Sequence, residues 1–257
     1  MTILSWHRGG VDRGVAVVLV HTWGSDGIED WDRTGVAQTL AQAGLAVVAP
    51  DLPGHGESAD VLVPPEAEPA KWTAHACLHD LDRLGVRRCT VVGYAGGGPV
   101  AGHLATSDDE RVRVDQLVLV GCDDLVEEPH TTAVAAALRH PGARVWHPEA
   151  AEIIAFARRD RRHELGTLAQ WLERRRWPAA PRLGALRMPV LLAVGAADPH
   201  RRRAPRLAQL FHDARLVTVP GDHRGALSSP ELGRHIADFV CGGMSPAVTG
   251  SPARQRS

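Results

Sequence analysis

A glycine-rich turn at residues 93–97 follows a β-branched run and is the segment of this sequence most typical of a reactive site. In the Gly-x-Ser-x-Gly form of such a strand-turn-helix elbow, the central serine presents its hydroxyl as a nucleophile. The central residue here is Ala95, between Tyr94 and Gly96. A methyl group cannot attack a carbonyl, so this elbow lacks the nucleophile that its shape would present.

A histidine and an acid lie in two loops downstream of the elbow. His223 follows a predicted strand at residues 215–219, and Asp198 follows a predicted strand at residues 190–194. A histidine that a carboxylate orients can accept and return protons during a reaction. These two loops therefore contain residue types that can transfer protons.

Other reactive side chains have simpler interpretations. His21 and His55 are expected to bind loop backbone rather than to catalyse. Asp222 is expected to form a turn. Cys122 could act as a thiol nucleophile, but it does not lie on an elbow, and a small buried residue at a strand end is the favoured interpretation.

The elements around these residues alternate between apolar strands and helices. A continuous apolar run at residues 15–20 is typical of a central strand covered on both faces. Further strands are predicted at residues 45–49, 89–92, 117–120, 190–194 and 215–219, with helices at 30–42, after the Pro-rich segment 64–69, after the elbow and at 230–240. This order predicts an α/β fold with a mostly parallel, doubly covered sheet.

The strand-helix alternation is interrupted between the strands at 117–120 and 190–194. The intervening segment has a helical pattern and is rich in Trp and Arg, which indicates a lid. The predicted organisation is therefore a core of residues 1–122 and 181–241, a helical lid of residues 123–180, and a disordered tail of residues 242–257.

The aromatic and basic residues of the lid have two interpretations each. Trp146, Trp171 and Trp177 could line a substrate pocket, with Tyr94 of the elbow, or could fasten the lid helices to the core. The arginine runs at residues 158–162 and 174–176 could face a carboxylate or a phosphopantetheine-like group of the substrate, although a solvated helix face is favoured.

The balance of charges limits the kinds of partner. The chain has 29 Lys and Arg against 30 Asp and Glu, a formal net charge of -1. Nucleic-acid and membrane-surface proteins need a field of one sign, so neither partner is expected, and a small-molecule substrate is favoured. No cofactor is expected. The predicted oligomeric state is a monomer or a homodimer.

The cysteines and the N-terminal sequence indicate the compartment. The four cysteines have no paired spacing, so neither a disulfide framework nor a metal site is indicated: they are Cys77, Cys89, Cys122 and Cys241. The first residues lack the charged region and apolar core of a signal peptide, and no apolar run reaches membrane-spanning length. A cytoplasmic location is therefore predicted.

The chain resembles the α/β-hydrolase family over about residues 3–240. Four segments in the order of the family carry the resemblance: residues 18–24, residues 50–58, the elbow at 93–97, and the paired loops at 194–199 and 219–223. Residues 50–58 are similar to the Asp-x-x-Gly-His-Gly-x-Ser turn of the family. Thr22 follows His21 where the family usually has glycine. The resemblance implies an α/β-hydrolase fold with a helical lid.

The resemblance also implies roles for the site residues. The order of nucleophile, acid and histidine in the family corresponds to Ala95, Asp198 and His223. His223 would accept the proton of the nucleophile and return it to the leaving group, while Asp198 fixes its tautomer. The backbone N–H groups of Trp23 and Gly96 would form the oxyanion hole. Some members place the acid after the earlier strand, so Asp123 and Asp124 remain alternatives to Asp198.

Ala95 leaves three hypotheses for function. In the first, the chain is a nucleophile-to-alanine variant of a hydrolase that acts on an ester, thioester or similar acyl bond of a bulky, partly apolar molecule, and it is inactive as a hydrolase. In the second, Ala95 is natural and His223 is the acid–base of a lyase, isomerase or cyclase reaction. In the third, the chain binds a ligand without catalysis. The retained Asp198 and His223 favour the two enzymes.

Overall fold

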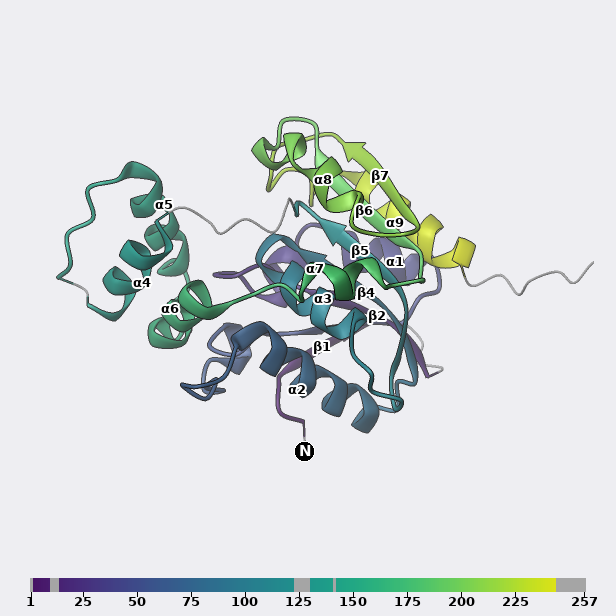
Figure 1. Cartoon of the computed structure of the whole chain (residues 1–257), viewed down its shortest axis with the longest axis horizontal. Helices are drawn as coiled ribbons and strands as arrows, with labels where there is room; N and C mark the ends of the chain where they lie inside the picture. The colour runs from purple at the N-terminus through teal and green to yellow at the C-terminus, as the bar shows by residue number, and fades with distance from the viewer. Residues whose placement is uncertain (1, 10–13, 123–129, 141, 244–257) are drawn as a thin grey trace, which may run out of the picture.

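The computed structural model describes residues 2–9, 14–122, 130–140 and 142–243. These residues form a seven-stranded sheet that runs through the body of the molecule (Figure 1). The strands are β1 (Trp6–Gly9), β2 (Val15–Val20), β3 (Val47–Pro50), β4 (Arg88–Tyr94), β5 (Arg113–Val120), β6 (Val190–Gly195) and β7 (Ala214–Val219). Their order across the sheet is β1-β3-β2-β4-β5-β6-β7, and only the β1–β3 pair among them is antiparallel. The predicted mostly parallel sheet is confirmed.

Helices occupy the connections between the strands. They are α1 (Val36–Gln42), α2 (Pro69–Arg83), α3 (Gly98–Ala105), α4 (Thr131–Arg139), α5 (Pro148–Ala157), α6 (Leu165–Arg174), α7 (Ala180–Gly184), α8 (Ala204–Ala208) and α9 (Pro230–Gly243). The described residues also form short 3-10 or π-helical turns, which are η1 (Ile28–Asp32), η2 (Gly56–Ser58), η3 (Ala95–Gly97) and η4 (Pro199–Arg202).

Helices cover both faces of the sheet. Successive side chains of a strand point to opposite faces. Val18 and Val91 belong to an apolar cluster that includes buried residues of α2 and α3. Their neighbours Val17 and Val92 belong to a second cluster, which includes buried residues of α1 and α9. This double burial explains why β2 is apolar at every position.

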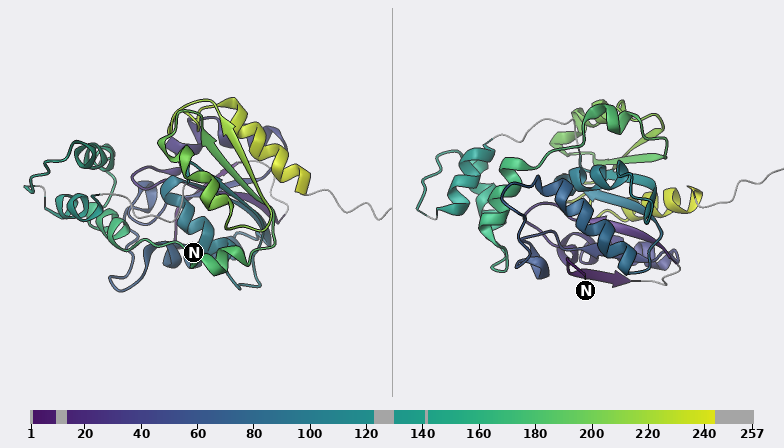
Figure 2. Two further views of the ribbon diagram at one scale, coloured as in Figure 1. Left: turned by 45° about the horizontal axis from the view of Figure 1, so that its top comes forward. Right: turned by 60° about the horizontal axis from the view of Figure 1, so that its bottom comes forward.

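Helices α4, α5 and α6, called here the cap helices, lie together at one end of the molecule, beside the sheet rather than against its faces (Figures 1 and 2). They belong to the segment for which the sequence predicts a lid. Residues 123–129 and 141 of that segment lie outside the described residues. The division into core and lid stays a prediction.

Along the described part of the chain, no helix combines the length and the apolar character needed to cross a membrane.

Two predicted helices differ from the observed ones. The predicted helix at 30–42 is divided into η1 and α1, because Gly35 adopts a left-handed φ of 83° that interrupts the helical path. The predicted helix at 230–240 continues to Gly243 as α9. The predicted disordered tail at 242–257 therefore begins inside a helix, and its residues from 244 onward lie outside the described residues.

Candidate active site

The elbow lies between the end of β4 at Tyr94 and the start of α3 at Gly98. Ala95 has a φ of 42°, a left-handed conformation that costs energy in any residue with a side chain. A Cβ added at Gly93 would lie only 2.7 Å from the Cβ of Ala101, so glycine is required for the helix to pack this closely on its strand. The backbone therefore has the geometry that presents residue 95 at the tip of the turn.

His223 and Asp198 form a hydrogen-bonded pair. The Nδ1 atom of His223 lies 2.9 Å from Oδ2 of Asp198, whose side chain is buried. Burial opposes ionisation of Asp198, but hydrogen bonds from His223 and from the backbone N–H of His200 outweigh it, so the pKa of Asp198 lies below its ordinary value. Nδ1 therefore donates to the carboxylate, and Nε2 is left as the proton acceptor of the ring.

Contacts with the ends of β4 and β5 place His223 beside the elbow. The Tyr94 hydroxyl donates to the His223 carbonyl oxygen at 3.2 Å, and the two rings lie 5.2 Å apart. Gly121, with a φ of 60°, lies so close that an added Cβ would be 3.0 Å from Cε1 of His223. The structure thus brings together residues from the ends of four strands. The alternative acids, Asp123 and Asp124, lie outside the described residues.

The two predicted oxyanion-hole donors are neighbours. A Cβ atom added at Gly96 would lie 2.7 Å from the backbone nitrogen of Trp23. The N–H of Gly96 donates to Oγ1 of Thr22 at 3.0 Å. The residue that stands where the family usually has glycine therefore places its hydroxyl against one of the two donors.

A buried carboxylate that the sequence analysis missed holds the loop of Thr22. Asp30 accepts hydrogen bonds from the backbone N–H of Thr22 at 2.9 Å and from Oγ of Ser25 at 2.6 Å. Burial raises the pKa of Asp30 above its ordinary value, although these bonds oppose the shift. Asp30 lies in the π-helical turn η1, and no sequence motif marks it.

His21 and His55 bind loop backbone, as expected. Nε2 of His21 accepts the N–H of Leu52 at 2.9 Å. Nε2 of His55 accepts the N–H of Gly24 at 3.0 Å, while Nδ1 donates to the Pro53 carbonyl at 2.9 Å. Burial lowers the pKa of His55 well below its ordinary value, which keeps the ring neutral and able to accept. These bonds join the loop after β2 to the loop after β3.

The predicted substrate-binding residues occupy very different surroundings. Trp171 is fully buried and donates from Nε1 to the Pro53 carbonyl at 3.2 Å, so it fastens α6 to the loop after β3. Trp146 is 83% exposed. Tyr94 is buried against His223 and Trp31. Trp171 and Tyr94 therefore have almost no side-chain surface to offer a ligand in this conformation.

One arginine of the run at 174–176 reaches the elbow. A Cβ atom added at Gly96 would lie 2.9 Å from Nη1 of Arg175. Arg174 instead donates to the Glu66 carbonyl. Trp177 packs against the start of α3, where an added Cβ at Gly98 would lie 2.8 Å from its ring. The sequence predicts a solvated helix face for the whole run, since no local signal separates Arg175 from its neighbours.

Cys122 lies beneath the elbow rather than at its tip. The side chain is buried, and its Sγ lies 3.5 Å from the Val120 carbonyl and 3.7 Å from that of Ala95. An added Cβ at Gly98 would lie 2.7 Å from the same sulfur. This packing agrees with the favoured interpretation of a small buried residue at a strand end.

One group at the site has the residue types of a metal site. A ligand atom from each of Asp198, His200 and His223 lies within 4.8 Å of the others. Both oxygens of Asp198 already accept hydrogen bonds within this group, from the His200 backbone and the His223 ring. A metal ion here would have to replace the bond that orients His223, so the geometry fits proton transfer better than metal binding.

Comparison with known proteins places this site in a family context. A family model described as "Alpha/beta hydrolase family" matches residues 17–232. The chain is 28% identical over 254 residues to the dihydrolipoyllysine-residue acetyltransferase component of an acetoin cleaving system from Pseudomonas putida, covering 98% of this chain and 58% of that protein. The chain thus spans less than two thirds of the length of this relative.

Two further similarities involve hydrolases. A 2-hydroxymuconate semialdehyde hydrolase from Pseudomonas putida is 34% identical over 108 residues, which cover 42% of this chain and 36% of that enzyme. The solved structure of a thermophilic esterase from Thermogutta terrifontis superposes with a TM-score of 0.73 at 22% identity and covers 94% of each chain. At this identity the structural match demonstrates a shared fold.

Proposed function

Because this chain belongs to the alpha/beta hydrolase family, we propose that its site is built to cleave an ester, thioester or similar acyl bond. The observation that carries the proposal is the hydrogen-bonded pair of His223 and Asp198 beside a glycine-rich elbow with a left-handed residue at its tip. A nucleophile at position 95 would pass its proton to Nε2 of His223. Backbone N–H groups of Trp23 and Gly96 would stabilise the oxyanion.

Ala95 removes the first step of that reaction. Loss of the nucleophile from a serine hydrolase lowers the rate by about 10⁶, which leaves what binding and the oxyanion hole supply. We therefore expect the chain to bind its substrate and to leave the acyl bond intact. The retained acid, histidine and elbow glycines support this reading over a ligand-binding module, which needs none of them.

Apolar side chains beside the loops of the site support an acyl substrate with a bulky, partly apolar body. Phe156 lies against Gly24, and Trp177 lies against Gly98. The esterase and the semialdehyde hydrolase among similar proteins agree with carbonyl chemistry.

The Ala95→Ser variant tests this proposal. We expect it to hydrolyse members of a panel of neutral and carboxylate-bearing aryl esters and thioesters that the parent chain leaves intact. Adding His223→Ala to that variant should remove the activity. If Ala95→Ser hydrolyses nothing, the proposal is wrong. Turnover by the parent chain that disappears in His223→Ala would instead establish the histidine as acid–base of a reaction without an acyl-enzyme.

A further inference from the structure

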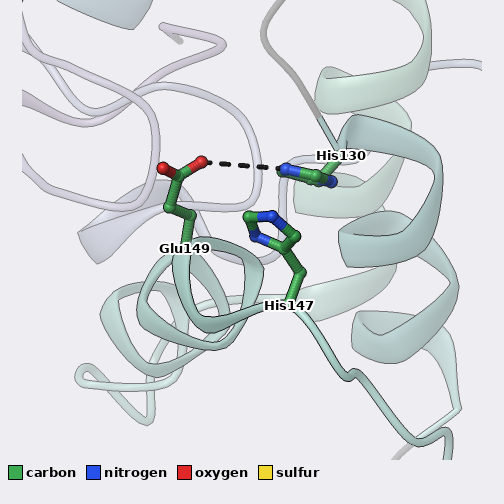
Figure 3. A group of neighbouring side chains, drawn as sticks. All are labelled: His130, His147 and Glu149. Atoms are coloured by element: carbon green, nitrogen blue, oxygen red, sulfur yellow. Dashed lines mark ion pairs between the residues drawn. The ribbon is translucent and has the colours of Figure 1, made fainter.

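We propose that His130, His147 and Glu149 form a binding site for a divalent transition-metal ion of the zinc type, which joins the starts of α4 and α5. Figure 3 shows the three side chains converging from the two helices, with the two imidazole rings face to face and the carboxylate beside them. The site lies in the cap helices and uses none of the residues around Ala95.

The distances between the ligand atoms fit one shared ion. One ligand atom from each residue lies within 4.8 Å of the other two, and Nε2 of His130 lies 3.7 Å from Oε2 of Glu149. Ligand atoms about 2.1 Å from a tetrahedral zinc ion are separated by roughly 3.4 Å from one another. Rotation of the three side chains, with the two imidazole rings turned out of their stack, would bring these atoms to that separation. All three are at least partly exposed, so an ion can reach them without any opening of the fold.

The two histidine rings lie in direct contact with each other. The His130 and His147 rings stack with their centroids 3.8 Å apart at 29°. An imidazole binds a metal ion through a lone pair in the plane of its ring, so the two rings would turn out of this stack to share one ion.

The backbone also holds His130 in an unusual conformation. His130 precedes α4 with a φ of 65°. Among the described residues, only His130 and Ala95 combine a side chain with a positive φ. Strained backbone of this kind is concentrated at functional positions, and Ala95 is the tip of the elbow. The His130 ring lies against the residues that begin α5, namely His147 as its N-cap and Glu149 in its first turn.

The ligand set selects the class of metal. Two imidazoles and one carboxylate suit zinc and its neighbours in the transition series, whereas magnesium and calcium prefer sets made only of oxygen. Three protein ligands leave a fourth position for water. A bound ion would tie α4 to α5 and stabilise the cap helices. The sequence gives no signal for this site, because residues 130 and 147 are separated by more than a short ligand spacing.

Calorimetric titration of the tag-free full chain with zinc chloride tests the site, with circular dichroism to check folding. The control is His140→Ala, which removes an exposed histidine just after α4 and outside the cluster. We expect the parent chain and His140→Ala to bind one more equivalent of zinc than His147→Ala. Glu149→Gln should weaken that equivalent by at least about tenfold, since even outer partners of metal ligands contribute 10- to 100-fold.

Two further measurements separate this site from the group at Asp198. Cobalt(II) in place of zinc should give the visible absorption of a tetrahedral site in the parent chain and in His200→Ala, and should lose it in His147→Ala. Zinc should raise the melting temperature of the parent chain, and magnesium should not. Equal zinc stoichiometry in His147→Ala and His140→Ala, or a cobalt spectrum that disappears only in His200→Ala, would overturn the proposal.

Discussion

Ala95 adopts a left-handed φ of 42° at the tip of the elbow, although its methyl side chain has no reactive atom to present there. A residue with a Cβ costs roughly 1–2 kcal/mol in this conformation, and glycine costs little. Strained backbone of this kind is concentrated at active sites, where it positions reactive groups. At position 95 the strained backbone conformation is present, but the reactive group is absent.

The strain predicts that Ala95→Gly stabilises the protein. Relief of the left-handed conformation outweighs the greater flexibility that glycine gives the unfolded chain, so we expect the free energy of unfolding to rise by about 0.5–1 kcal/mol. Urea denaturation followed by circular dichroism measures the change. A loss of stability, as is usual when alanine becomes glycine at an unstrained position, would show that the elbow is relaxed.

Thr22 provides a second prediction at the same scale. Its hydroxyl accepts the Gly96 N–H at 3.0 Å, so one oxyanion donor is engaged before any substrate arrives. Breaking such a bond costs roughly 0.5–1.5 kcal/mol net. In the Ala95→Ser background, Thr22→Ala should therefore raise kcat about three- to tenfold in a steady-state ester assay. A fall in kcat would mean that the hydroxyl itself donates to the oxyanion.

Among the elements, the loop after β3 connects the site to the cap helices. His55 in this loop accepts the N–H of Gly24, beside the oxyanion donors. Gly54 and Pro53 of the same loop accept the N–H of Glu164 and the indole N–H of Trp171. The loop thus sets the position of α6 relative to the elbow through three hydrogen bonds.

A matched pair of tryptophans tests the role of the cap helices. Trp171 is fully buried and hydrogen-bonded, so Trp171→Ala should lower the free energy of unfolding by about 3–5 kcal/mol. Trp146 is 83% exposed, so Trp146→Ala should change it by less than about 0.5 kcal/mol. Urea denaturation compares the two variants. Equal effects would contradict the anchoring role of Trp171.

For the whole molecule, the sheet could be predicted from sequence more fully than the site. The apolar run at 15–20 coincides with β2, because a strand buried on both faces is apolar throughout. The strand predicted at 117–120 is longer in the structure, since β5 begins at Arg113 with four residues of which only Val114 is apolar. Propensity and pattern report burial, and they lose the ends of strands where burial stops.

The site could be predicted only where residues belong to a motif. Asp198 and His223 lie in loops of recognisable sequence, and the structure brings them within hydrogen-bond distance. Asp30 and Arg175 contact the oxyanion loop and the elbow from η1 and the end of α6. Their positions depend on how distant elements pack, which no local pattern records.

The pH dependence of stability follows from a buried carboxylate at the edge of the sheet. Asp51 accepts the N–H groups of Gly27 and Glu57 at 2.9 and 2.8 Å and pairs with His7 at 3.1 Å. Burial opposes its ionisation, but these contacts lower the pKa of Asp51 below its ordinary value. Contact with Asp51 in turn raises the pKa of His7, against the effect of burial.

These shifts predict where Asp51→Asn is most harmful. The Asp51 contribution is complete above its unfolded pKa of about 3.9 and is lost as the pH falls through its lower folded pKa. The His7 contribution is complete below about pH 6.5 and is lost as the pH rises through its raised folded pKa. The decrease in the free energy of unfolding caused by Asp51→Asn should therefore be largest, about 3 kcal/mol, between about pH 3.9 and pH 6.5. Urea denaturation of the parent chain and the variant across about pH 3–9 measures this difference in the free energy of unfolding. A difference that increases above about pH 7 would contradict the prediction.

The most direct test of a hydrolase site that lacks only its hydroxyl is the reaction of Ala95→Ser with a fluorophosphonate, followed by intact mass spectrometry. Such reagents form a stable adduct with a serine that a histidine activates. We expect one adduct on Ala95→Ser, mapped to position 95, and none on the parent chain or on Ala95→Ser combined with His223→Ala. A folded Ala95→Ser protein that stays unlabelled, or labelling that is unchanged without His223, would contradict this interpretation of the site.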